Sequence, residues 1–288
     1  MGLSRRGLLH GAAVAATLPA STLLHADPAA GVLRLLRFTL TATNPTPVSL
    51  EQQALWIYMP MRLTSTQALE QLTVSAPYEL LGDALEHSIV KLSFDRVAPL
   101  ASKVVSFTAQ VRLAPQPAPS VLPDPRAWLG AQRFIEVDDP AIQACAAQLR
   151  RASAMGTASA IYEWVRGNLQ YAGYLADGLG ARVALATRRG DCTEYASLAV
   201  ALARANGIPA RMVGGYVAPG PIAPRPQDYH DWAEVYVDGA WRTLDAQKAQ
   251  WSPHPAGYVA FHINTEAALN PIGLAHRFRV DGELQVRL

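Results

Sequence analysis

The sequence predicts an α+β fold in which an N-terminal β-sandwich precedes helices packed on an antiparallel sheet. Three observations support this prediction. Apolar and polar residues alternate through most of residues 32–113, a proline-rich stretch follows at 114–125, and beyond it the apolar spacing becomes first that of helices and then that of strands. Alternation with a period of two is typical of half-buried strands, and helices followed by strands indicate the α+β order. Half of the 288 residues are hydrophobic, which is enough for a sizeable core.

The first residues resemble an export signal. Arg5-Arg6 precedes an uncharged, alanine-rich run that ends at Leu24-His25-Ala26, which is similar to a small-residue cleavage site. This order is typical of a twin-arginine signal peptide, so we expect residues 1–26 to be removed and the protein to be periplasmic or secreted. A membrane anchor is the alternative, but the run 7–24 contains a histidine and a proline and is short for a span. We therefore expect no stable membrane insertion after cleavage.

Charge and cysteine content exclude several classes of protein. Residues 1–26 hold two arginines and no acid, so their removal leaves 23 basic against 23 acidic residues. A net charge near zero gives no basic surface for nucleic acid, so no nucleic-acid partner is expected. Two cysteines are too few for a disulfide scaffold or a thiolate metal site, and no calcium-binding loop is visible. We predict no metal and no cofactor. A twin-arginine substrate folds in the reducing cytoplasm, which favours free thiols.

Residues 27–113 are predicted to form the β-sandwich domain. About five strands are expected from the alternating pattern, at 34–41, 55–59, 71–76, 89–94 and 105–113. Glu86, His87 and Asp95 are interpreted as solvated strand ends. The segment 114–125 contains five prolines and no periodic pattern, so it is predicted to be a stiff linker between two domains.

Residues 126–288 are predicted to form the second domain. Apolar stripes with helical spacing run over 142–149 and 161–169, and a third helix should begin near Cys192 and end at Asn206-Gly207. This third helix is apolar on most faces, so it should be central and buried. Strands are expected at 211–217, 232–237 and 241–244.

Two dipeptides in this second domain predict hairpin turns. Asp238-Gly239 joins two of the expected strands, and Asp281-Gly282 should form a further hairpin near the C-terminus, within residues 277–288.

Cys192 stands at a position that favours chemistry. Asp191 is a good N-cap and Glu194 follows three residues later, so a capping box should place Cys192 in the first turn of its helix. Free N–H groups there would lower the pKa of the thiol and could also bind an oxyanion. Position alone does not make a thiol reactive, so a structural role remains open. Cys145 lies on an apolar helix stripe and is predicted to be structural.

His230 is the histidine best placed to act as a base. If Asp238-Gly239 is a two-residue turn, Val237 pairs with Ala240 and His230 lies opposite Gln247. Asp245 then becomes the diagonal neighbour of His230, at about 7 Å between backbone positions, which lets a carboxylate reach an imidazole. The hairpin therefore predicts a His–Asp pair.

Three segments together carry a family resemblance. These are AIYEWVRGNLQYAG at 160–173, GDCTEYASLAVALARANGIPARMVGGYV at 190–217 and HDWAEVYVDGAWRTLDA at 230–246. They resemble the core of the transglutaminase-like superfamily, whose members share a papain-like fold, and the likeness covers about residues 135–250. The resemblance implies that Cys192 is the nucleophile, His230 the base and Asp245 the acid that orients the base.

The expected function is that of an exported cysteine-dependent acyl-transfer enzyme acting on a protein or peptide. Attack on an amide would give a thioester, which water or an amine could resolve. We favour water, hence a peptidase or amidase; a protein-glutamine transglutaminase and a non-catalytic peptide-binding module are the alternatives. Tyr171, Tyr174 or Trp164 could supply a second oxyanion donor, and the proline-rich loop 218–229 could border the cleft or be a variable surface loop.

Overall fold

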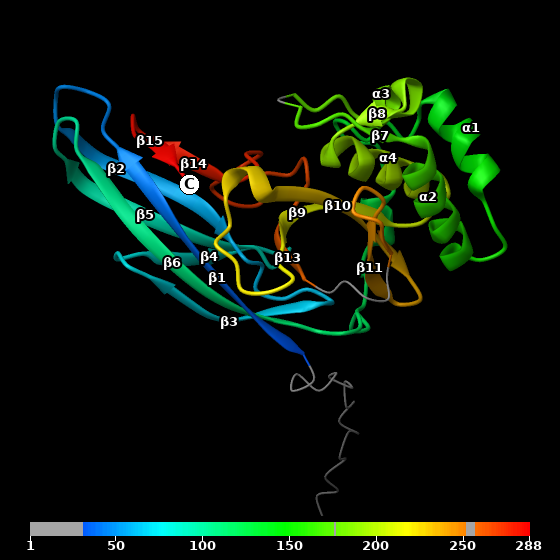
Figure 1. The fold of residues 1–288 in the computed structure, drawn as a ribbon, viewed down its shortest axis with the longest axis horizontal. Coiled ribbons are helices and arrows are strands. Elements are labelled where there is room, and N and C mark those ends of the chain that lie inside the picture. Colours follow the sequence, from blue (N-terminus) through cyan, green and yellow to red (C-terminus); the bar gives the residue numbers. More distant parts are fainter. Residues whose placement is uncertain (1–30, 176, 252–256) are drawn as a thin grey trace, which may run out of the picture.

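The computed structural model describes residues 31–175, 177–251 and 257–288 and has the predicted α+β fold. Figure 1 shows a β-sandwich on one side, a group of helices on the other, and strands β9, β10 and β13 between them. The signal peptide predicted at 1–26 lies outside the described residues. None of the helices within the described ranges is long and apolar enough to cross a membrane.

The N-terminal part of the chain forms six strands, one more than expected. They are β1 (Val32–Thr43), β2 (Leu50–Met59), β3 (Gln67–Val74), β4 (Glu79–Gly82), β5 (Ser88–Val97) and β6 (Ser102–Leu113). β1, β6 and β3 lie in one sheet, and β2, β5 and β4 lie in the other. The alternation along β6 buries one face of the strand, including Phe107 at 1% exposure, against the opposite sheet.

The hairpin predicted across Asp281-Gly282 is wrong. Strand β14 (Phe278–Asp281) pairs with β2, whereas β15 (Gln285–Arg287) pairs with β1 in the other sheet. The chain crosses between sheets at Gly282, whose φ is +121°, and the Gln53 side chain accepts a hydrogen bond from the Glu283 N–H (2.7 Å). Each strand covers an otherwise open sheet edge, and Leu284 enters the sandwich core, so these residues pack with the N-terminal sheets.

Among the described residues, four α-helices follow the proline-rich segment. They are α1 (Pro140–Leu149), α2 (Ala154–Asn168), α3 (Ala181–Thr187) and α4 (Cys192–Ala205), and two-residue strands β7 (Gln170–Tyr171) and β8 (Arg189–Gly190) pair beside them. The prediction of a central third helix is confirmed, because α4 is buried from Glu194 to Arg204 and packs against α1, α2 and α3. α3 was not expected.

The helices cover a five-stranded sheet with the order β12-β11-β10-β9-β13. Its strands are β9 (Ala210–Val217), β10 (Tyr229–Val237), β11 (Ala240–Asp245), β12 (Gln250–Trp251) and β13 (Tyr258–Ile263). The predicted hairpin is confirmed from Val237↔Ala240 to Ala233↔Leu244. The ladder stops there, because β11 ends at Asp245 and the chain turns back to pair Asp245 with Gln250. The expected pairing of His230 with Gln247 is therefore not formed.

Buried polar groups join the sandwich to this sheet. The Gln67 amide donates to the carbonyls of Met61 (2.9 Å) and Ala260 (3.0 Å) and accepts from the Ala260 N–H (2.7 Å). His87 is 1% exposed, which corrects its interpretation as a solvated strand end. Its Nδ1 lies 2.7 Å from Asp83 Oδ2 and its Nε2 accepts from the Ile263 N–H (2.9 Å).

His262 lies in the same contact between the sandwich and the five-stranded sheet, and its buried ring makes that contact testable. The ring is 4% exposed and lies 4.7 Å from the ring of Tyr58 and 5.2 Å from that of His87, between ring centres. Burial, together with His87 and His276, lowers the pKa of His262 to about 3 from 6.5. Because the unfolded chain binds this proton at a higher pH than the folded chain, stability is lost as the pH falls from 6.5 toward 3.

We expect the free energy of unfolding to fall with a contribution from His262 of about 1.4 kcal/mol for each pH unit below 6.5. His262→Phe keeps an aromatic ring but cannot titrate, so its stability should fall less steeply over the same range. Urea unfolding at pH 7, 6, 5 and 4 measures both slopes. Equal slopes for the two proteins would contradict a buried, neutral His262.

Candidate active site

Cys192 begins helix α4, and a capping box fixes this start as the sequence predicts. The Asp191 carboxylate accepts from the Thr193 N–H (2.8 Å), and the Glu194 carboxylate accepts from the Asp191 N–H (3.1 Å). Gly190 is required just before the cap, because a Cβ there would lie 2.2 Å from Glu194 Cβ. The first turn of α4 is thus held by its own acids.

The remaining oxygens of the same two acids hold the neighbouring loop. Asp191 Oδ2 accepts from the Leu175 N–H (2.9 Å), and Glu194 Oε1 accepts from the Leu179 N–H (2.8 Å). The backbone that leads to Cys192 is therefore hydrogen-bonded to the neighbouring loop at residues 175 and 179. Sequence reasoning assigned these acids to the cap alone, because the second set of partners comes from a loop without a periodic pattern.

His230 and Asp245 form the predicted pair. The two residues are 5% and 2% exposed, and His230 Nε2 lies 2.6 Å from Asp245 Oδ2. A carboxylate only accepts, so Nε2 carries the proton and donates it to Asp245. This tautomer leaves Nδ1 of the neutral ring unprotonated and able to take a proton.

Tyr258 completes this network and was missed by sequence reasoning. Its hydroxyl donates to Asp245 Oδ2 (2.7 Å), while the Lys248 N–H donates to Asp245 Oδ1 (2.9 Å). Burial, followed by the charge of Asp245, raises the pKa of Tyr258 well above 10. The apolar run 258–263 could have indicated a strand, but no local signal places it beside Asp245.

The Cys192 thiol is half-buried and is not activated in the way the sequence suggested. Burial, then the charges of Asp231 and Asp191, raises its pKa to about 12 from 9.0. Hydrogen bonds from the Asp231 backbone and the Thr193 side chain lower the pKa only in part. The expectation of a lowered pKa is therefore corrected, because desolvation in the folded chain exceeds the effect of the helix start. At neutral pH the resting thiol is protonated.

The structure brings Cys192 to the strand that carries His230. α4 packs on β10, and Cys192 meets that strand at Asp231, the residue after His230. Within the described ranges, no hydrogen bond joins the thiol to the imidazole, and active-site hydrogen bonds are often long before substrate binds. The role of Cys192, His230 and Asp245 as one catalytic unit stays a prediction.

The other candidates are placed as follows. Tyr171 and Tyr174 are 57% and 81% exposed on the segment beside the cap. Trp164 packs under the Arg188 guanidinium, 4.4 Å from the ring centre, which gives it a structural contact. The loop 218–229 borders the sandwich, because Ile222 exchanges backbone hydrogen bonds with Leu35 and Arg37 of β1 (3.0 Å each). Cys145 is buried, and both cysteines are free.

The described residues contain no group of three or more His, Cys, Asp or Glu side chains that could hold a metal ion.

Comparison with known proteins gives a family match over part of the chain and a shared fold. Residues 143–246 match the model of the transglutaminase-like superfamily. A crystal structure from Cytophaga hutchinsonii, of a protein proposed to be a cysteine protease, aligns over 90% of both chains with a TM-score of 0.59 and 19% identity, so it shows the shared fold. The periplasmic domain of TgpA from Pseudomonas aeruginosa aligns with a TM-score of 0.40 and 18% identity, over 80% of this chain and 84% of that one. No curated protein matches the chain by sequence.

The Tyr258 hydroxyl should contribute more to stability than a buried tyrosine with a neutral partner. Tyr258→Phe removes a donor from a buried carboxylate, which we expect to cost about 1.5–3 kcal/mol in the free energy of unfolding. Tyr195→Phe is the matched control, because Tyr195 donates to the Leu169 carbonyl (2.7 Å) and its loss should cost about 1 kcal/mol. Urea unfolding of both variants at pH 7 makes the comparison. Equal costs would mean that Asp245 does not depend on Tyr258.

Proposed function

Because residues 143–246 match the model of the transglutaminase-like superfamily, we propose that the protein is a cysteine-dependent acyl-transfer enzyme that hydrolyses amide bonds in proteins or peptides. The observation that carries the proposal is the buried hydrogen bond of 2.6 Å between His230 and Asp245. His230 lies on β10, and Cys192, at the start of α4, contacts the same strand at Asp231. A nucleophile, a base and a group that orients the base are the components such chemistry needs.

The attack begins from a protonated thiol. Cys192 Sγ forms a bond to the amide carbon while its proton passes to His230 Nδ1, and the imidazolium is stabilised by the Asp245 carboxylate. The amide C–N bond then breaks as the imidazolium returns the proton to the leaving amine, which produces a thioester on Cys192. Since the thiol pKa of the resting enzyme is about 12, a nearby base is required for this step at neutral pH.

The start of α4 can also stabilise the oxyanion that forms during attack. The Thr193 N–H is occupied by Asp191, whereas the Cys192 N–H has no hydrogen-bond acceptor among the described residues. That N–H lies at the positive end of the helix dipole, next to the sulfur that bonds the carbonyl carbon. It is therefore the main-chain donor best placed to bind the developing negative charge.

The thioester is resolved by water in the proposed reaction. Water attacks the thioester carbon and loses a proton to His230. The C–S bond then breaks, the acid product is released, and the imidazolium returns the proton to Cys192 Sγ. A primary amine in place of water would give a transglutaminase, and a protein that binds peptides without cleaving them is the remaining alternative. The proposed location, periplasmic or secreted, rests on the twin-arginine signal in the sequence.

Replacing the nucleophile gives the direct test. Cys192→Ala should reduce hydrolysis of a mixed library of unblocked peptides by about 10³-fold or more, because the covalent route is lost. Cys145→Ala is the matched control and should retain activity, since Cys145 is buried outside the site. Mass spectrometry of the library after incubation measures both. Equal cleavage by wild type and Cys192→Ala would exclude the proposal, and binding without cleavage by wild type would favour the peptide-binding module.

Water and a primary amine can be compared, in one reaction mixture, as the acceptor that resolves the thioester. We expect wild type, given glutamine-containing peptides and an excess of a labelled primary amine, to give cleaved or deamidated peptides and little labelled product. Mass differences between the products distinguish these outcomes. Predominant incorporation of the amine would instead identify a transglutaminase.

A further inference from the structure

The sandwich and the five-stranded sheet enclose an aromatic recess. Its rings come from both parts of the chain: Phe38 from β1, and Tyr216, Tyr229 and Phe261 from the sheet. Tyr216 meets the other two sheet rings edge to face, with ring centres 5.4 Å from Tyr229 and 5.2 Å from Phe261. The recess has a volume of about 30 Å³, which is enough for about two water molecules.

The recess adjoins a larger groove, because Phe38, Pro224 and Leu288 line both. The groove has a volume of about 490 Å³ and runs between β1, β6 and the proline-rich loop before β10. Its charged lining residues are Arg37 and Arg225, and none of the described residues that line the groove or the recess is an aspartate or a glutamate. A groove of this size can hold part of an extended peptide, whereas the recess admits only a small group.

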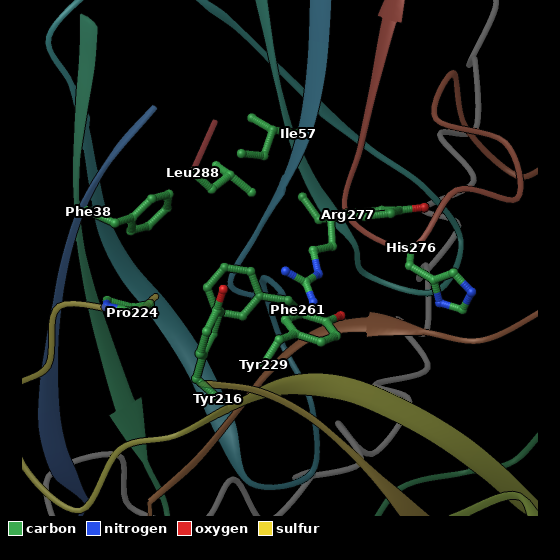
Figure 2. Close-up of a pocket in the computed structure, with 10 residues that line it drawn as sticks. Phe38, Ile57, Tyr216, Pro224, Tyr229, Phe261, His276, Arg277 and Leu288 are labelled. Carbon is green, nitrogen blue, oxygen red and sulfur yellow. The ribbon is translucent and has the colours of Figure 1, made fainter. Parts of the chain in front are cut away.

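Arg277 supplies a positive charge to the recess. Figure 2 shows its side chain reaching toward Tyr229 and Phe261, and the guanidinium carbon lies 4.4 Å from the centre of the Tyr229 ring. One guanidinium nitrogen donates to the Pro226 carbonyl (3.1 Å). In the described part of the chain, no carboxylate lies within ion-pair distance of Arg277, so its other N–H groups are available to an anion.

Tyr216 supplies a hydroxyl without a partner. The residue is 8% exposed, and its hydroxyl makes no hydrogen bond among the described residues. Figure 2 shows this hydroxyl pointing away from the strand into the pocket. Burial raises the pKa of Tyr216, and the charge of Arg277 opposes that rise, so the hydroxyl lies within the field of the guanidinium. Asp228 is the acid nearby, and both of its oxygens already accept from Arg225 (2.7 and 2.8 Å).

We propose that the Arg277 guanidinium and the Tyr216 hydroxyl bind a carboxylate of the peptide substrate in this recess, while the neighbouring part of the peptide lies in the groove. Each carboxylate oxygen is about the size of a water molecule, so the group fits a space for two waters. It accepts from both donors and gives the hydroxyl the partner it lacks. This inference rests on the proposed function and specifies its substrate class, a peptide with an acidic side chain or a free C-terminus.

The register of the sheet places the recess next to the proposed base. Tyr229 directly precedes His230 on β10, and their partners on β9 are Tyr216 and Gly215. A wall of the recess and the base are thus carried by consecutive residues, whose Cα atoms are about 3.8 Å apart. A peptide held by its carboxylate can therefore extend toward Cys192, and binding energy from this remote group would serve to orient the amide that is cleaved.

The first experiment measures binding without turnover. The full chain carrying Cys192→Ala is titrated by calorimetry at pH 7 with three acetylated tripeptides that begin alanine-leucine. They end in glutamate amide, in glutamine with a free C-terminal carboxylate, or in glutamine amide, which has no carboxylate. We expect at least one carboxylate peptide to bind about tenfold or more tightly than the glutamine amide, and the tighter of the two identifies the source of the carboxylate. Equal affinity for all three, or no binding of any, would overturn the inference.

Variants in the same background assign the binding to the recess. Tyr216→Phe keeps the ring and should weaken binding of the carboxylate peptide by about tenfold, and Arg277→Gln should weaken it at least as much. Arg279→Gln is the matched control, because Arg279 also donates to a proline carbonyl (Pro271, 2.9 Å) and lies over an aromatic ring, but lines neither cavity. Its affinity should be unchanged.

The variants also show which result would reject the inference. Tyr216→Phe removes a hydroxyl that has no partner, so its thermal midpoint should not fall, and it decides the test even if Arg277→Gln does not fold. A preference for the carboxylate peptide that persists in Tyr216→Phe and in every folded Arg277 variant would reject the inference. An equal loss of affinity in Arg279→Gln would reject it as well.

The second experiment measures turnover and separates this inference from the proposed function. Pairs of peptides that differ only by glutamate or glutamine, or by a free or amidated C-terminus, are compared by kcat/KM. Wild type should prefer the acidic member, and Tyr216→Phe should lose about tenfold of that preference, mainly through a higher KM. Cleavage by wild type without any such preference would reject the inference while leaving hydrolysis established. Carboxylate binding by Cys192→Ala with no cleavage of any peptide by wild type would count against the proposed function alone.

Discussion

The carboxylate of Asp245 is the constraint on which the site depends. A buried anion is tolerated only when its oxygens are satisfied by hydrogen bonds, and here the donors come from three places: His230 on β10, Tyr258 on β13 and the turn after β11 at Lys248. The order of the sheet and the register of the hairpin must both be correct for these donors to converge. The anion thereby orients the imidazole and joins the two sides of the sheet.

Local signals determined most of what could be predicted. The Asp238-Gly239 turn sets the register that places Asp245 diagonal to His230, and the pattern Asp191 to Glu194 sets the start of α4. Both depend on residues a few positions apart, so the sequence contains the whole reason for them. Helix α3 was not predicted, because the apolar pattern of a seven-residue helix is too short to distinguish it from a loop.

The failures concern long-range contacts. Tyr258 reaches Asp245 only through the pairing of β13 with β9, and His87 is enclosed by residues far away in the sequence, among them Ile263 and His262. The prediction that the pKa of the Cys192 thiol is lowered failed for a related reason. A helix start favours the thiolate locally, but a pKa of about 12 rather than 9.0 makes ionisation about a thousandfold less favourable, or about 4 kcal/mol, through burial and the acids brought to Cys192 by the fold.

The crossing of the last two strands into different sheets has a consequence for how the chain is made. Residues 32–113 are synthesised first, but one edge of each of their sheets is covered only by residues 278–287, more than 160 positions later. Until those residues leave the ribosome, both edges expose unpaired backbone groups, and closure requires contacts of long sequence separation, which form slowly. The sandwich therefore reaches its final form only after the residues around Cys192 have been made, so the two sheet edges closed by residues 278–287 are the last part of it to form.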